Sequence, residues 1–262
     1  MVRRFRSPLL WILLLTACVY GATLTNGFVN LDDPLLVTEN PHVLTPSFAN
    51  VWYVFTHFDP ELYIPVTFLS YQLEVWTLGL HAWHLHLFSL LVHFGCIALI
   101  YAIAKKLSAS TVTAIITASL FALHPINAEA VLWISARKDL LSGFFGLATM
   151  YSFLSWQERG GRKRYWLSVF FFLLALGSKV TIVMLPLILL LLLRRRTHLM
   201  KSLKNVLPFF VLAIIFLLYV LFQSKNLIEG PIISITKPSN GETLTYNAVS
   251  YTHLTLPTNR EV

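Results

Sequence analysis

The chain has 262 residues, of which 56% are hydrophobic and only 12% are charged. So few charges cannot cover the surface of a soluble domain of this length, and the composition therefore excludes an ordinary soluble protein. The net charge of +8 does not indicate nucleic-acid binding, because no basic stretch carries interleaved aromatic residues outside an apolar run. The sequence instead predicts an integral membrane protein whose chemistry lies in polar loops.

Apolar runs of near-span length recur along the chain. They cover the ranges 7–24, 84–104, 107–124, 140–157, 165–178, 180–193 and 205–223. The first run has only a weak small-residue cleavage pattern, so we interpret it as a span and not as a signal peptide. A span needs roughly 20 residues, so the two runs that flank Lys179 are short. We count them as two crossings, because all four basic clusters then share one face.

This topology is an all-α, polytopic transmembrane helix bundle of about seven spans. The amino terminus and the basic clusters, with 14 of the 20 Lys and Arg residues, are expected in the cytoplasm. The segment 25–83 then forms a large first outer loop, and 125–139 forms a second. Eight of the 12 acidic residues fall in these two segments. Polar groups gathered on one side of a bundle indicate where a site lies.

The first loop contains the adjacent carboxylates Asp32 and Asp33 within Asn30–Pro34. A carboxylate at this position is a candidate proton acceptor in acid–base catalysis. The alternative is a turn or a helix cap, since Asn, Asp and Pro are common turn residues.

Histidines cluster around the second apolar run. His86, Ser89 and His93 are three and then four residues apart, so they share one helical face. Metal ligation is conceivable, but a helical His pair without a placed carboxylate is weak evidence for a metal site. Hydrogen bonding between helices is the favoured interpretation.

The second loop combines acidic and basic groups. His124, Glu129, Arg137, Lys138 and Asp139 are spaced so that they could bind an anion such as a phosphate. The alternative is anchoring at the membrane interface by aromatic and basic side chains. Lys179, at the turn between the two short spans, either snorkels to the interface or extends to the same anion site.

Four ordered blocks resemble a known family: GFVNLDDPLLVTENPHV, ELYIPVTFLSYQLEVW, LFALHPINAEAVLWISARKDLLS and LALGSKVTIVMLPLILLLLL. They look like the membrane domain of the transmembrane-and-tetratricopeptide-repeat proteins, relatives of the protein O-mannosyltransferases within the GT-C glycosyltransferase class. The resemblance covers about Asn26 to Leu193. It implies a GT-C-like fold, a catalytic carboxylate in the first loop and a polyprenyl-phosphate sugar as donor.

The resemblance also assigns roles. Asp32 matches the first acidic residue of the family's loop motif and would be the base, and Asp33 matches the second. Ile64 stands where eukaryotic members often have Arg. The remaining residues match the family's helix pattern or its bacterial-type version, with Ser89 in place of the usual Asn: His86, His93, His124, Glu129, Arg137, Lys138 and Asp139. A bacterial inner membrane is therefore expected in preference to the endoplasmic reticulum.

Family members continue into further spans and helical repeats, whereas this sequence has no 34-residue periodicity. We expect residues 1–248 to be an incomplete GT-C-like membrane domain. Residues 249–262, VSYTHLTLPTNREV, look like the translation of sequencing-adapter DNA and are expected to be an unstructured, non-native tail.

Two functions follow as hypotheses. The first is transfer of a sugar, such as mannose, from a polyprenyl-phosphate donor to a hydroxyl group of a protein Ser or Thr at the outer face. Asp32 would accept the proton, and Arg137, Lys138 and Lys179 would bind the donor phosphate; no metal site is predicted, and metal dependence stays open. The partners would be membrane lipid and an acceptor protein. The alternative is a non-enzymatic scaffold or a transporter with an anion-binding outer vestibule.

Overall fold

The computed structural model describes residues 8–59, 62–194, 199–228, 233–236 and 243–246. The chain divides into two compact units, residues 1–217 and 218–262. All the elements described in the first unit are helices, which confirms the predicted all-α fold. The first unit also contains all the candidate site residues.

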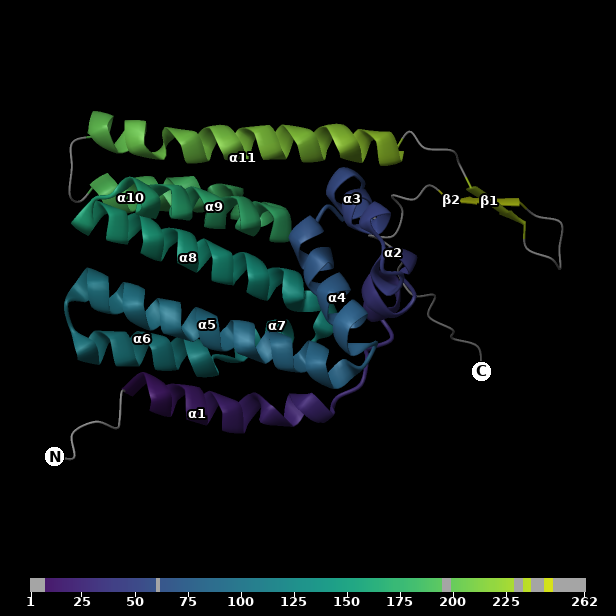
Figure 1. Cartoon of the computed structure of the whole chain (residues 1–262), viewed down its shortest axis with the longest axis horizontal. Coiled ribbons are helices and arrows are strands. Elements are labelled where there is room, and N and C mark those ends of the chain that lie inside the picture. Colours follow the sequence, from purple (N-terminus) through teal and green to yellow (C-terminus); the bar gives the residue numbers. More distant parts are fainter. Residues whose placement is uncertain (1–7, 60–61, 195–198, 229–232, 237–242, 247–262) are drawn as a thin grey trace, which may run out of the picture. The chain divides into compact units, whose positions relative to one another are not determined.

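Long helices form the body of the first unit (Figure 1). They are α1 (Pro8–Tyr20), α5 (Ala82–Ser108), α6 (Thr111–Leu123), α8 (Arg137–Arg159), α9 (Arg162–Ser178), α10 (Leu185–Arg194) and α11 (Leu199–Ile228), the last of which continues into the second unit. The remaining helices lie in the connections: η1 (Gly21–Thr25), the π-helical turn η2 (Pro34–Thr38), α2 (Pro41–Leu44), α3 (Phe48–Thr56), α4 (Pro65–Leu78), η3 (Pro125–Asn127), α7 (Ala128–Leu132), η4 (Ile134–Ala136) and η5 (Val180–Met184). Every predicted apolar run coincides with a long helix, and the run 180–193 contains η5 followed by α10.

Fewer helices qualify as membrane spans, by their length and composition, than the seven predicted from the sequence. In the described part of the chain, Pro8–Thr25, Ala82–Ser108 and Ser202–Ser224 are long and apolar enough to cross a membrane. Thr111–Leu123 and Pro125–Leu132 make a fourth candidate if this pair, bent by 51°, is one span. The structure supports an integral membrane protein but does not confirm seven spans.

The helices alternate in direction, so their connections gather at two opposite ends of the first unit (Figure 1). One end holds the connection from α5 to α6, the connection from α8 to α9 and the start of α11. Basic residues lie at this end, among them Lys105 and Lys106 in the last turn of α5 and Arg162 at the start of α9. The cluster at Arg3, Arg4 and Arg6 lies outside the described residues. The opposite end holds α2, α3, α4 and the connection 124–136.

Local sequence explains where several helices begin and end. The Asn40 side chain accepts hydrogen bonds from the first backbone N–H groups of α2, and Ser47 and Ser110 do the same for α3 and α6. Gly160 and Gly161 both have positive φ angles, 65° and 93°, which a tight reversal between α8 and α9 requires.

A buried apolar cluster holds the first loop against the long helices. It includes Val43, Val54, Phe68, Tyr71, Leu85 and Ile134, which come from α2, α3, α4, α5 and η4. The N-terminus of α4 also packs closely on α9, because a Cβ atom at Gly177 would lie only 2.7 Å from Cγ2 of Val66. The first loop is therefore a folded cap at this end of the unit.

The second unit contains a short antiparallel hairpin of β1 (Ile233–Thr236) and β2 (Thr243–Tyr246), with Ile233 paired to Tyr246. This hairpin was not predicted. The expected non-native tail, residues 249–262, lies outside the described residues, so its predicted lack of structure stays a prediction.

Candidate functional site

Asp33 joins the first loop to the turn before α8. Its carboxylate accepts hydrogen bonds from the backbone N–H of Val29 at 2.8 Å and from the backbone N–H of Ser135 at 3.1 Å. The Ser135 hydroxyl donates a third hydrogen bond to the same carboxylate. Asp33 and Ser135 are both fully buried. A carboxylate enclosed by three donors holds two segments together and is not open to an incoming substrate.

Asp32, the neighbouring carboxylate, is only half-buried. It belongs to a group of charges that surrounds Lys138. Burial lowers the pKa of Lys138 below its ordinary value, and the carboxylates of Asp32, Asp139 and Glu129 partly oppose this shift, whereas the ammonium of Lys179 adds to it. The Lys138 ammonium donates a hydrogen bond to the Ser135 carbonyl at 3.1 Å. The predicted base and two predicted phosphate-binding cations therefore lie in one neighbourhood.

The Arg137 side chain contacts α4 and α5 and not the charges around Lys138. Its guanidinium is fully buried and forms an ion pair with Glu74 of α4. It also donates hydrogen bonds to the Ser70 hydroxyl at 3.2 Å and to the Leu85 carbonyl at 2.8 Å. The rings of Tyr71 and Phe88 lie 4.5 and 4.7 Å from the guanidinium carbon. A phosphate would have to displace Glu74 to bind this side chain.

Glu74 and Tyr71 complete this buried network. The Tyr71 hydroxyl donates a hydrogen bond to the Ile134 carbonyl at 2.7 Å, and His84 lies 3.5 Å from the Glu74 carboxylate. Burial raises the pKa of Glu74, and the charge of Arg137 opposes this increase. The network ties α4 and α5 to the start of α8, directly behind the turn that binds Asp33.

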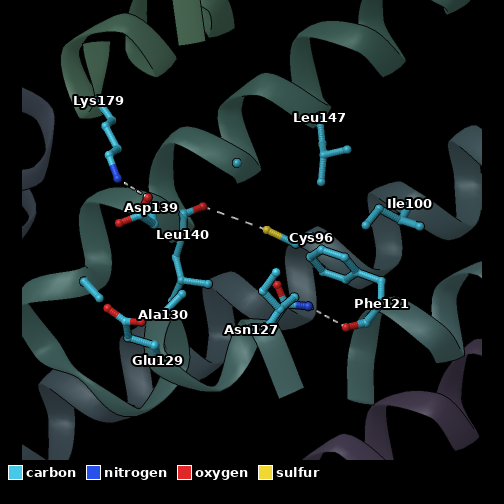
Figure 2. Close-up of a pocket in the computed structure, with 13 residues that line it drawn as sticks. Cys96, Ile100, Phe121, Asn127, Glu129, Ala130, Asp139, Leu140, Leu147 and Lys179 are labelled. Carbon is cyan, nitrogen blue, oxygen red and sulfur yellow. Dashed lines mark hydrogen bonds and ion pairs between the residues drawn. The ribbon is translucent and has the colours of Figure 1, made fainter. Parts of the chain in front are cut away.

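A pocket of about 580 Å³ lies beside these charges. Its polar wall includes Asn127, Glu129 and the ion pair between Asp139 and Lys179. Figure 2 shows the Lys179 side chain extended toward Asp139, above Glu129. The apolar wall is formed by Ile100, Phe121, Leu140 and Leu147, with Cys96 between α5 and α8. Neither Asp32, the predicted base, nor Arg137, a predicted phosphate-binding cation, lines this pocket.

The histidines form hydrogen bonds to neighbouring segments. Nε2 of His86 donates to the Gly27 carbonyl at 3.4 Å, and Nε2 of His93 donates to the Ala122 carbonyl of α6 at 3.2 Å. His124 is exposed, and its Nδ1 accepts a hydrogen bond from the Ile126 N–H as the cap of η3. Among the described residues, no three His, Cys, Asp or Glu side chains come together as metal ligands.

The sequence analysis missed three of these residues. Glu74 and Ser135 hold Arg137 and Asp33, and Asn127 lines the pocket and donates a hydrogen bond to the Phe121 carbonyl at 2.7 Å. Only Glu74 gave a usable signal, because it is the one carboxylate in the largely apolar stretch LYIPVTFLSYQLEVW, and a buried carboxylate needs a cation as its partner.

Comparison with known proteins identifies the family. Residues 65–222 match the model of the dolichyl-phosphate-mannose-protein mannosyltransferases, so Asp32 and Asp33 lie outside the matched range. The human protein O-mannosyl-transferase TMTC1 is 30% identical over 174 residues, which cover 60% of this chain and 19% of that protein. Drosophila melanogaster Tmtc2 is 34% identical over 58% of this chain and 17% of its own length. Human TMTC3 is 32% identical over 53% of this chain and 16% of its own length.

The chain thus spans less than a fifth of the length of these relatives. No solved structure matches it. The match to the family model nevertheless covers more than half of the chain, and it includes α4, the second outer connection and all the long helices except α1. The chain therefore belongs to the dolichyl-phosphate-mannose-protein mannosyltransferase family, as a TMTC-like, all-α membrane domain of the GT-C class.

Proposed function

We propose that the protein containing this chain transfers a mannose from a polyprenyl-phosphate carrier to a Ser or Thr hydroxyl group of an acceptor protein. The names of the relatives, protein O-mannosyl-transferases, support this reaction. The observation that carries the proposal is the grouping of Asp32, Lys138 and the Asp139–Lys179 pair beside a pocket that is polar on one side and apolar on the other.

The reaction is a single displacement that inverts the sugar. The acceptor oxygen forms a bond to the anomeric carbon as the bond from that carbon to the phosphate oxygen breaks. The acceptor proton passes to Asp32, which is the more accessible of the two adjacent carboxylates. The departing polyprenyl phosphate carries the negative charge, which Lys138 and Lys179 offset.

The pocket suits a lipid phosphate. Lys179 reaches its polar edge, while Ile100, Phe121 and Leu147 offer apolar contact to the first isoprenyl units. In the structure Asp139 neutralises Lys179, so a donor phosphate has to compete with this carboxylate. Glu129 and Asp139 line the polar side of the pocket, and His124 caps η3, which carries the lining residues Ile126 and Asn127. His86 and His93 support the neighbouring helices.

Asp33 and Arg137 act as positioning residues in this scheme. Three hydrogen bonds to Asp33 fix the chain on either side of Asp32, and the buried pair of Arg137 with Glu74 fixes the start of α8, where Lys138 and Asp139 are located. Both contribute by placing charged neighbours, and neither needs to touch the donor.

We also retain residues 1–248 as the GT-C-like membrane domain, with the site on the outer face and the basic clusters in the cytoplasm. The relatives named above come from animals and lend no support to the expected bacterial inner membrane. The alternative function is that of a scaffold or transporter with an anion-binding vestibule. It would use the same lysine side chains to bind an anion but would need no catalytic base.

The test separates binding from transfer. The chain in lipid nanodiscs is incubated with a photoreactive polyprenyl-phosphate mannose, and cross-linking is measured for Lys179→Ala and Lys138→Ala. Both substitutions should reduce cross-linking, whereas Lys106→Ala, which removes a lysine paired with Glu158 at the opposite ends of α5 and α8, should not. Equal cross-linking in all variants would show that the donor does not bind in this pocket.

Transfer is measured in the complete protein with a Ser- and Thr-containing peptide. Asp32→Asn should abolish transfer and leave membrane insertion and donor cross-linking intact. Glu39→Gln is the control, because Glu39 is an exposed carboxylate of the same loop. Full activity of Asp32→Asn would reject Asp32 as the base, and a wild-type protein that binds the donor without any transfer would favour the vestibule.

A further inference from the structure

Four buried polar side-chain atoms belong to α5 and to the neighbouring segment Tyr20–Gly27. They are Thr23 Oγ1, His86 Nδ1, Ser89 Oγ and His93 Nδ1. None of the four has a hydrogen-bond partner among the residues that the structure describes, and all four residues are at least 98% buried. A buried polar atom without a partner is costly, so a row of four requires an explanation.

A contact at each end of this row shows where it lies. Tyr20 lies edge-on to His93, with ring centroids 5.6 Å apart, and the Gly27 carbonyl accepts a hydrogen bond from His86. Tyr20 contacts His93 and Gly27 contacts His86, so the two segments run antiparallel. The 3-10 helix η1 rises about 2 Å per residue and α5 about 1.5 Å, so Thr23 lies about as far along from Tyr20 as Ser89 lies from His93, roughly 6 Å. Thr23 therefore falls opposite the turn of α5 that contains Ser89. The row extends over about 10 Å of helix.

The hydrogen bonds already present determine what the row can bind. Each imidazole uses Nε2 as a donor to a carbonyl, so in the neutral ring Nδ1 is an acceptor. Ser89 would ordinarily donate to the Leu85 carbonyl one turn earlier, but that carbonyl already accepts from Arg137. The row thus offers two acceptors and two hydroxyl groups. A small ligand that both donates and accepts hydrogen bonds would satisfy all four.

We propose that ordered water molecules bind along this row of atoms, here called the track, and bridge Thr23, His86, Ser89 and His93. Buried water makes about three hydrogen bonds to polar atoms that would otherwise lack partners, which fits the chemistry of the row. The outer end of the track lies where the chain leaves α1 and η1 toward Asp32 and Asp33. Bound water therefore holds the start of the first outer loop against α5. This inference does not depend on sugar transfer.

The test is hydroxyl-radical footprinting by X-ray radiolysis of the chain in nanodiscs, with rapid mixing into ¹⁸O-labelled water. Radicals formed from bound water label adjacent side chains that bulk solvent does not reach. Tyr20 and His93 should be oxidised several-fold faster than Phe153 and Phe172, which are as deeply buried but lie in an apolar cluster. Oxidation of Tyr20 and His93 at the rate of the two phenylalanines would overturn the proposal.

Two substitutions that remove a hydroxyl group provide a second test. Thr23→Val and Ser89→Ala should each reduce oxidation at Tyr20 and His93 and lower the Tm, because a bridging partner is lost. Thr16→Val is the control, since the Thr16 hydroxyl already donates to the Ile12 carbonyl at 2.8 Å and should leave the footprint unchanged. A raised Tm for Thr23→Val with an unchanged footprint would show that the hydroxyl is simply unsatisfied, and would reject bound water.

Discussion

The Ser135 hydroxyl donates a hydrogen bond to the Asp33 carboxylate across 102 residues of sequence, and the Ser135 backbone N–H binds the same carboxylate. The first outer loop and the turn before α8 therefore form one structural unit. Lys138 donates to the Ser135 carbonyl, so the same residue also positions a cation that interacts with Asp32. A change at Ser135 should alter both sides of the candidate site.

Ser135→Ala should lower the free energy of unfolding by about 1–3 kcal/mol, because a buried carboxylate loses one of three donors and no water reaches the position. The measurement is thermal or denaturant unfolding in detergent. Ser155→Ala is the matched control, since that hydroxyl binds only the Tyr151 carbonyl of its own helix and should change stability little. Equal effects of the two substitutions would show that the bond to Asp33 contributes nothing specific.

Glu74→Gln should be more damaging, with a loss of about 3–5 kcal/mol, because it leaves the buried Arg137 guanidinium without a counter-charge. The double variant Glu74→Leu with Arg137→Met should recover part of this loss, since no unpaired charge remains. Glu158→Gln, at the more exposed pair with Lys106, should cost less than about 1 kcal/mol. A double variant less stable than Glu74→Gln would contradict this account of the network.

Much of the fold could be predicted because apolar runs and basic clusters carry information that does not depend on packing. The runs 84–104 and 140–157 lie within α5 and α8, and the turn at Lys179 ends α9. The span count could not be obtained in the same way. The connection through η5 into α10 and the bend of 51° after Leu123 depend on contacts with neighbouring helices and not on local hydropathy.

The directions of the charged side chains at the start of α8 could not be predicted from the sequence pattern. Arg137, Lys138 and Asp139 are consecutive, and the sequence treats them as one charged group. At the start of a helix, however, consecutive side chains point about 100° apart. Arg137 therefore turns toward Glu74, Lys138 toward Ser135, and Asp139 toward Lys179 and the pocket. Which face of α8 points inward is set by tertiary packing, so the burial of Arg137 could not be predicted from its neighbours.

The pKa of Lys138 tests whether Asp32 lies nearby. Asp32→Asn should lower this pKa further, because it removes a carboxylate that favours the charged amine, whereas Lys179→Gln should raise it by removing a like charge. The measurement is NMR of ¹³C-methylated lysines. Because the unfolded chain holds the Lys138 proton more tightly, this residue makes stability rise as pH increases from the folded pKa toward the ordinary value of 10.5. An unchanged or raised Lys138 pKa in Asp32→Asn would show that Asp32 does not lie near Lys138.

The competition between Asp139 and a phosphate gives the last prediction. Asp32, Glu129 and Asp139 place three negative charges around the two ammonium groups of Lys138 and Lys179, so the unliganded site has an excess of negative charge. Asp139→Asn removes this excess and releases Lys179 from its ion pair. Binding of farnesyl phosphate, a soluble polyprenyl phosphate, should become tighter by about 1 kcal/mol, roughly fivefold in Kd.

Isothermal titration in nanodiscs measures this change, and the gain should shrink at high salt because the site is partly exposed. Lys179→Ala should weaken binding. Glu158→Gln is the control, because it also releases a lysine, Lys106, from a carboxylate but at the opposite end of α8 from Asp139, and it should leave the Kd unchanged. Weaker binding to Asp139→Asn would mean that this carboxylate takes part in holding the ligand, and the phosphate would then have to be placed away from Lys179.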